Sequence, residues 1–172
     1  YVRIIFMRDL ETLSKVMNSG DIKRYHTLPT IGEQTNATHS WGVAVIATYL
    51  HPILNARVLL KALMHDVGEI ETGDIPAPVK WENPELKKQL NVLEARVAKN
   101  LEIEYELTDY EKRIFKQADM FELLFFCVKQ RKLGNRHINH VFSNGVEKLS
   151  EGNLNKRGQE LLGYLLTIYG GV

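Results

Sequence analysis

Apolar residues recur at intervals of three or four along most of the chain, the spacing of one face of an α-helix. The first run holds Leu10, Leu13 and Met17, and Gly20 ends it. A polar stretch then extends to Asn36 before the pattern resumes. The pattern predicts helices over residues 10–19, 38–50, 55–64, 84–101, 108–133, 138–149 and 156–169.

Several helix boundaries are marked by residues that cap or break helices. Thr108 with Glu111 three residues later has the form of a capping box, and Gly134 stands where that long helix should end. Asn83 followed by Pro84 predicts another helix start, because proline is tolerated at the first helical position. These signals fix the order of the predicted helices.

Three other segments carry weaker signals. Asn55 is expected to cap the third helix. Pro76 and Pro78 interrupt residues 69–82, which we expect to form a loop. The opening segment Tyr1–Met7 is apolar, but no small-residue cleavage site follows it, so we expect it to dock on the protein instead of acting as a signal peptide.

The fold class follows from what the pattern contains and lacks. No alternating strand pattern of useful length occurs, and the chain has no repeat, linker or low-complexity tract. A chain of 172 residues fits one domain and can bury a sizeable core. We therefore expect an all-α, single-domain helical bundle over residues 1–172.

Composition narrows the possible partners. A net charge of +1 argues against a broad face for a nucleic-acid polymer or a membrane, and no apolar run reaches transmembrane length. Cys127 is the only cysteine, so no intrachain disulfide can form, and its apolar neighbours predict a buried thiol. These features favour a cytoplasmic protein.

The first sign of chemistry is a histidine next to an aspartate, His65 and Asp66, with Glu69 and Asp74 following shortly after. Imidazole and carboxylate together suit divalent ions such as Zn, Mn, Co or Fe. Adjacent residues point about 100° apart on a helix, so both reach one ion only where the helix frays, and Gly68 marks such an end. The two later acids could handle a water or a leaving group, as in metal-assisted hydrolysis.

Two further ligand candidates lie on other predicted helices. His39 begins an amphipathic helix, where capping or packing is its commoner role. Asp119 shares one helical face with Phe115 and Phe126. An aspartate between phenylalanines is costly to bury unless it is paired or bound to a metal. A salt bridge with Lys116 or another cation is the alternative for Asp119.

Taken in order, His39, His65-Asp66 and Asp119 match the H…HD…D signature of HD-domain phosphohydrolases, which this chain resembles. Residues 72–80 read TGDIPAPVK, and with the surrounding motifs they make the chain similar to the bacterial 5′-deoxynucleotidases of the YfbR-like family. Residues 24–27, RYHT, resemble the DatZ-like phage dATP triphosphohydrolases that accompany diaminopurine genomes.

The resemblance implies a role for each matched residue. The expected metal ligands are His39, His65, Asp66 and Asp119, holding Zn, Co or Mn, with additional Mg for a triphosphate substrate. Glu69 and Asp74 are the expected acid and base, in an order that the sequence leaves open. The expected phosphate contacts are Arg24, Lys80 and Lys116, and the expected base or sugar contacts are Tyr25 and Pro78. Two departures are Tyr25, where the family often has tryptophan, and Thr38, where it often has glutamate.

The resemblance implies metal-dependent cleavage of the 5′-phosphoester of a 2′-deoxynucleotide. Our main interpretation is a dNTP, and specifically dATP, triphosphohydrolase that gives a deoxynucleoside and triphosphate. The alternative is a 5′-deoxynucleotidase that releases phosphate from dNMPs. We expect a homo-oligomer, a dimer or higher.

Two other functions fit less well. A non-catalytic nucleotide-binding module would not need four ligand positions and two acids, all of which are present. A cyclic-nucleotide phosphodiesterase with a bridged two-metal site would require extra histidines. His137 and His140 lie three apart on a predicted helix and could bind a surface metal, but we interpret them as exposed polar residues.

Overall fold

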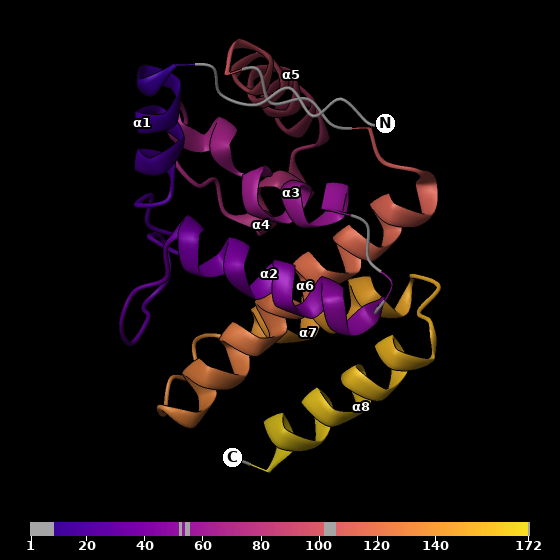
Figure 1. Ribbon diagram of the computed structural model, residues 1–172. Helices are drawn as coiled ribbons and strands as arrows, with labels where there is room; N and C mark the ends of the chain where they lie inside the picture. Colours follow the sequence, from indigo (N-terminus) through magenta and orange to yellow (C-terminus); the bar gives the residue numbers. More distant parts are fainter. Residues whose placement is uncertain (1–8, 52, 54–55, 102–105, 172) are drawn as a thin grey trace.

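The computed structural model describes residues 9–51, 53, 56–101 and 106–171, and this part of the chain is helical (Figure 1). The all-α prediction is therefore confirmed. The elements are α1 (Leu10–Ser19), α2 (Asn36–Leu50), α3 (Ala56–Met64), the 3₁₀ helix η1 (Val67–Ile70), α4 (Ala77–Glu82), α5 (Pro84–Asn100), α6 (Asp109–Lys132), α7 (Asn139–Ser150) and α8 (Lys156–Gly170).

The predicted capping signals have different outcomes. Thr108 and Glu111 form the full capping box at the start of α6, in which each side chain bonds the other residue's backbone N–H. Asn83 does precede α5, but its side chain donates to the Val79 carbonyl at 3.0 Å and makes no cap bond. Helix α2 starts two residues earlier than expected, because Thr35 provides its N-cap.

The expected loop over residues 69–82 contains two short helical pieces, the end of η1 and all of α4. The loop prediction was wrong for residues 77–82. Pro76 is the N-cap of α4 and Pro78 lies in its first turn, where a backbone N–H would have no helical partner. Proline at these positions starts a helix and does not break one.

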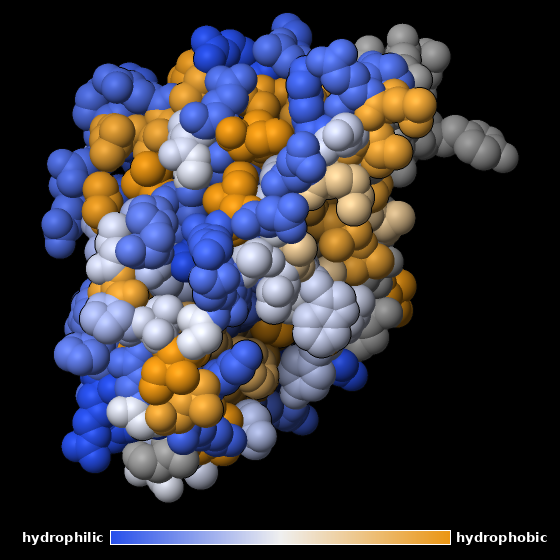
Figure 2. Space-filling model, turned by 90° about the vertical axis from the view of Figure 1, so that its left-hand side faces the viewer, coloured by the Kyte–Doolittle hydropathy of each residue, from blue (hydrophilic) through white to orange (hydrophobic). Residues whose placement is uncertain are grey.

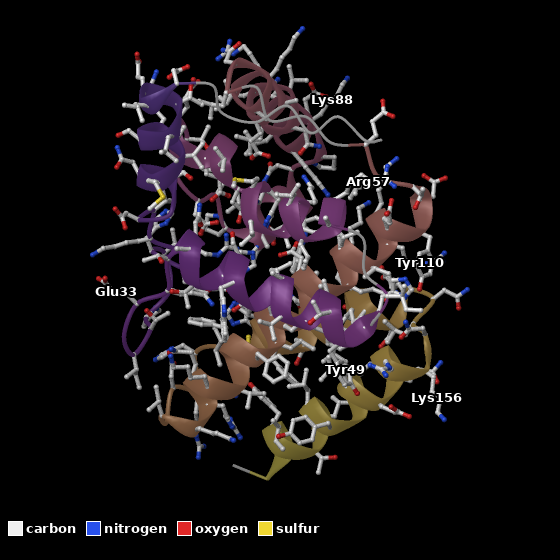
Figure 3. All side chains as sticks on the ribbon, in the orientation of Figure 1. Glu33, Tyr49, Arg57, Lys88, Tyr110 and Lys156 are labelled. Carbon is white, nitrogen blue, oxygen red and sulfur yellow. The ribbon has the colours of Figure 1, made fainter. Side chains whose placement is uncertain are left out.

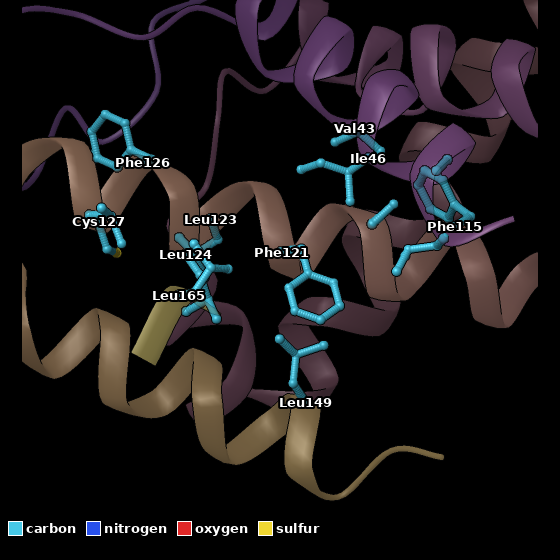
Figure 4. Packing of buried hydrophobic residues seen from close by; sticks show 14 of the residues in the cluster. Val43, Ile46, Phe115, Phe121, Leu123, Leu124, Phe126, Cys127, Leu149 and Leu165 are labelled. Atoms are coloured by element: carbon cyan, nitrogen blue, oxygen red, sulfur yellow. The ribbon is translucent and has the colours of Figure 1, made fainter. Parts of the chain in front are cut away.

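Helix α6 is the centre of the main core, because it packs against α2, α3, α7 and α8. In the close view of Figure 4, Phe121 and Leu124 of α6 lie between Val43 and Ile46 of α2 on one side and Leu165 of α8 on the other. All five side chains are buried. The core thus fixes the middle of α6 against the middle and second half of α2.

A smaller cluster joins α1, η1 and α5. Its buried members are Val16, Val67, Val97 and Leu101. Gly68 of η1 lies so close to α5 that an added Cβ would come within 2.7 Å of the Cβ of Glu94. Glycine is therefore required where η1 meets α5.

We expect Gly68→Ala to destabilise the protein by about 1–3 kcal/mol, because the new methyl group must displace the α5 backbone. Thermal unfolding followed by circular dichroism measures the effect. Gly163→Ala is the matched control, since nothing lies within 4 Å of an added Cβ at that exposed α8 position. The control should gain up to about 1 kcal/mol from helix propensity. Equal melting temperatures for the two variants would contradict this packing argument.

Other sequence expectations concern burial and membranes. Cys127 is buried in the main core, as predicted, and burial raises the pKa of its thiol. No helix in the described part of the chain is long and apolar enough to cross a membrane. Figure 2 shows one face of the protein, where hydrophilic and hydrophobic residues are mixed. The Tyr1–Met7 segment and the Asn55 cap lie outside the described residues.

Candidate functional site

Two imidazole rings face each other where α2 and the end of α3 meet. Nε2 of His39 lies 3.1 Å from Nε2 of His65. Nδ1 of His65 lies 2.9 Å from the Ala62 carbonyl, which can only accept, so that nitrogen carries the proton. Nδ1 of His39 lies 2.5 Å from a carboxylate oxygen of Glu122. When both rings are neutral, as metal ligation requires, each therefore turns an unprotonated Nε2 toward the other.

Two carboxylates complete this arrangement. Asp119 Oδ1 lies 3.1 Å from Nε2 of His39 and 4.0 Å from that of His65. Asp66 Oδ2 lies 3.6 and 3.2 Å from the same two nitrogens. One ligand atom from each of His39, His65 and Asp119 fits within 4.8 Å. Three of the four predicted ligands therefore meet at one point, and Asp66 lies beside the two histidines.

These donors fit a divalent ion. Two imidazole nitrogens lie only 3.1 Å apart, and their lone pairs would repel each other at that distance unless a proton or a metal ion lies between them. Their separation is close to that of two nitrogens bound to one Zn²⁺, at about 2.0–2.1 Å each. Carboxylates on the same side add the negative charge that such an ion requires. His39, His65, Asp66 and Asp119 would hold it.

The local fold explains how adjacent residues reach the same point. Helix α3 ends at Met64, and His65 and Asp66 form the turn that leads into η1. Outside the helix, the two side chains need not point about 100° apart as helical neighbours do, so both can reach one ion. His65 also packs edge-on against Phe115 of α6, with ring centroids 5.1 Å apart. The α6 face that carries Phe115 and Asp119 therefore borders the site.

Arg24 binds the acids beside this point. Its Nη1 donates to Asp66 Oδ2 at 2.6 Å and lies 3.8 Å from Asp74 and 4.0 Å from Glu69. Burial alone would lower the pKa of Arg24, but these carboxylates, Asp66 foremost, raise it. The side chain is 15% exposed. The guanidinium is thus charged, partly desolvated and fixed beside Asp66.

Glu69 and Asp74 occupy different positions around Arg24. Glu69 is 2% exposed, and its Oε2 accepts from Asn36 Nδ2 at 2.9 Å. Burial, together with the charge of Asp66, raises the pKa of Glu69 to about 8. Asp74 accepts from the Tyr25 backbone N–H at 3.3 Å and lines the adjoining cavity. Asp74 is therefore the acid closer to a bound molecule.

The segment before α2 brings Arg24 and Tyr25 to the site. Tyr25 has a φ of +58°, which is rare for a residue with a side chain, and its ring stacks on Phe126 at 4.1 Å. Further along the loop, the side-chain amide of Gln130 bonds both the N–H and the C=O of Ile31. Glu33 lies at the outer edge of the molecule (Figure 3). Helix α6 therefore holds this loop against the site.

A cavity of about 370 Å³ opens beside the four ligand residues. Its lining combines Asp66, Asp74, Asp119 and His39 with Arg24, Lys80, Lys87, Asn91, Glu94 and His140, and with Tyr25, Thr27, Leu28, Pro76, Ala77, Pro78, Val79, Trp81, Met120, Leu123 and Val141. This volume suits a small organic molecule.

The predicted contact residues differ in their placement. Arg24, Tyr25, Pro78 and Lys80 all line the cavity. Lys116 is exposed on α6 and is not among the lining residues, so its predicted phosphate contact has no support in the geometry.

Sequence reasoning missed residues on α5 and α7. Lys87, Asn91 and Glu94 line the cavity from successive turns of α5. Their spacing of four and three places them on one helical face, a signal that the apolar stripe of the same helix obscured. His140, interpreted as merely exposed, is exposed but also lines the cavity.

Comparison with known proteins identifies a family. The model of the family described as "5'-deoxynucleotidase YfbR-like" matches residues 11–159. A 5′-deoxynucleotidase of Vibrio cholerae is 28% identical, with 86% of each chain covered. The 5′-deoxynucleotidase YfbR of Escherichia coli O127:H6 is also 28% identical, with 66% of this chain and 69% of the relative covered.

Solved structures share the fold. The cyanophage S-2L HD phosphohydrolase DatZ, solved with dA and one catalytic Zn²⁺ ion, matches with a TM-score of 0.68 over 98% of this chain and 100% of its own. An HD-domain phosphohydrolase of Listeria innocua matches with a TM-score of 0.72 over 91% and 85%. Both are 22% identical to this chain, so they support the fold alone.

Proposed function

The chain belongs to the YfbR-like 5′-deoxynucleotidase family of HD-domain phosphohydrolases, and from this membership we propose that it is a metal-dependent 5′-deoxynucleotidase that releases phosphate from dNMPs. The observation that carries the metal dependence is the pair of imidazole Nε2 atoms 3.1 Å apart, flanked by Asp66 and Asp119. The substrate class comes from the named relatives.

This proposal departs from the sequence-based preference for dATP. The relatives named above are 5′-deoxynucleotidases, which favours the alternative interpretation over the triphosphohydrolase. One observation keeps the triphosphate as a competing substrate. Lys80 and Lys87 both line the cavity and could bind further phosphates. Adenine preference and selection of 2′-deoxyribose remain predictions.

We assign the metal to His39, His65, Asp66 and Asp119. When bound, the ion supplies Lewis-acid polarisation of a phosphoryl oxygen. Zn²⁺ is the first candidate because two imidazoles and two carboxylates suit it, and Co²⁺ and Mn²⁺ are the expected substitutes. An additional Mg²⁺ would accompany a triphosphate only.

The other residues bind the substrate and manage its protons. Arg24, held by Asp66, presents a fixed cation to the scissile phosphate, for which a planar guanidinium is well shaped. Asp74 lines the cavity and can hold a proton at its carboxylate for the water or the leaving 5′ oxygen. Tyr25, stacked on Phe126, and Pro78 offer flat apolar surfaces to a base or sugar.

Product identity tests the proposal. Protein loaded in turn with Zn²⁺, Co²⁺ or Mn²⁺ is incubated with dAMP, dATP, AMP and dGMP, and chromatography separates phosphate from triphosphate. Release of phosphate from dAMP, with slower turnover of AMP, is the expected result. If triphosphate is released from dATP with a higher kcat/KM than phosphate from dAMP, the dATP triphosphohydrolase interpretation is the better one. Equal rates on dAMP and dGMP would show that the enzyme does not select the base.

We also propose that the chain forms a homo-oligomer through α2. Trp41, Val45 and Tyr49 lie four residues apart on this helix and are 66%, 47% and 42% exposed. Such a stripe on a helix whose other face is buried is typical of a protein interface. Light scattering of the purified protein measures the assembly, and a monomer mass at micromolar concentration would contradict it.

A further inference from the structure

A third carboxylate lies behind the metal site and takes no part in the family signature. Glu122, one turn after Asp119 on α6, is 6% exposed. Its Oε2 lies 2.5 Å from Nδ1 of His39, and its Oε1 accepts from Gln34 Nε2 at 2.7 Å. Each oxygen of this buried carboxylate therefore has a hydrogen-bond donor.

The surrounding fold makes room for this carboxylate. Gly42 of α2 faces it, and a Cβ there would come within 2.7 Å of Cγ of Glu122. Gln34 is itself 6% exposed, and its Oε1 is buried with no hydrogen-bond partner among the described residues. Burying a carboxyl group is costly unless its oxygens are hydrogen-bonded, and here Gln34 and His39 provide the partners.

We propose that Glu122 is a positioning residue, which holds His39 in the tautomer and orientation that bind the metal ion. A carboxylate accepts a hydrogen bond but does not donate one, so the proton of a neutral His39 stays on Nδ1. Nε2 is then left with its lone pair directed at Nε2 of His65 and at Asp119. The charge of Glu122 also makes His39 a stronger ligand.

The same geometry predicts how substitutions should differ. Glutamine has the same shape as glutamate but no charge, and its amide nitrogen can donate to His39 and favour the wrong tautomer. Methionine is similar in length and offers only a weak acceptor. Both variants keep the ligands His39, His65, Asp66 and Asp119 unchanged. A loss of metal affinity in them would therefore come from the orientation or basicity of His39.

Metal affinity tests this inference, which rests on the proposed metal site. Apo protein is titrated with Co²⁺ and followed by visible absorption, and Zn²⁺ affinity is measured by competition with a chromogenic chelator. We expect Glu122→Gln to weaken both affinities by about 10- to 100-fold, the usual effect of losing such a partner. Glu122→Met should weaken them further, and kcat of Glu122→Gln on dAMP should recover at saturating metal.

Controls separate this role from a structural one. Glu147→Gln changes an exposed glutamate of α7 and should leave metal affinity unchanged. Circular dichroism and melting of the apo proteins report folding independently of the metal. Folded Glu122 variants with wild-type affinity for both ions would overturn the inference.

The same experiment distinguishes this inference from the proposed function. Wild-type protein that binds Co²⁺ and hydrolyses no dNMP would overturn the proposed function alone, because metal affinity would still report on Glu122. Wild-type protein that binds neither ion would overturn both proposals.

Discussion

Replacing Asp66 by asparagine is expected to abolish hydrolysis and to weaken metal retention, while the helical signal persists. Asp66 Oδ2 faces both histidine Nε2 atoms and also accepts from Arg24 at 2.6 Å. Although burial alone would raise the pKa of Asp66, its interactions with His65, foremost, and with Arg24 hold that pKa well below its usual range. The substitution removes this fixed negative charge and hardly changes the shape of the side chain.

The expected magnitude is large because one change affects both the metal and the phosphate-binding cation. A bound metal ion contributes several kcal/mol to transition-state stabilisation, so kcat/KM should fall by on the order of 10³-fold or more. Elemental analysis after gel filtration measures metal content, and phosphate release from dAMP measures activity. Asp21→Asn, at an exposed aspartate before α2, is the matched control. Full metal content and activity in Asp66→Asn would refute the ligand assignment.

The fold was predictable because its helices carry local signals. The capping box of Thr108 and Glu111 and the glycine after Leu133 defined α6 within a few residues. Residues 77–82 were not predictable in the same way. Two prolines are typical of a loop, and only the position of Pro76 as an N-cap makes them compatible with a helix.

The candidate site was predictable where its residues form a spaced motif. His39, His65, Asp66 and Asp119 come from three separate regions of the chain, and their order in a known signature predicted that they meet. Glu122 could not be assigned in this way, because a single glutamate on a helical face is consistent with many roles. Its role depends on the distance from Oε2 to His39, which only the packing of α2 against α6 determines.

The lysines at the cavity are a second feature that the sequence alone could not place. Lys116 and Lys80 had equal support from the motifs, yet only Lys80 lines the cavity, and Lys87 joins it from α5. Which lysine reaches a cavity depends on how a helix is rotated about its axis. That rotation is set by tertiary contacts such as the close approach of Gly68 to Glu94.

Glu69→Gln should keep metal and nucleotide binding and lose most turnover. Glu69 Oε2 accepts from Asn36, and Arg24 and Lys80 lie 4.0 and 3.9 Å from its two oxygens. A glutamine can still accept the bond from Asn36, so the substitution removes the acid–base function with little change in packing. A carboxyl group whose pKa is raised to about 8 by burial and by Asp66 can exchange a proton near neutral pH.

The size of this effect identifies the role of Glu69. Loss of a general acid or base lowers turnover by about 10²- to 10⁴-fold, whereas loss of a ligand would lower metal content as well. Single-turnover kinetics with dAMP, metal analysis and equilibrium nucleotide binding separate these effects. Glu71→Gln, at an exposed glutamate two residues away, controls for a general change of charge near η1. If metal content and turnover fall together in Glu69→Gln, Glu69 is a ligand or a structural acid, and Asp74, which lines the cavity, becomes the principal acid–base residue.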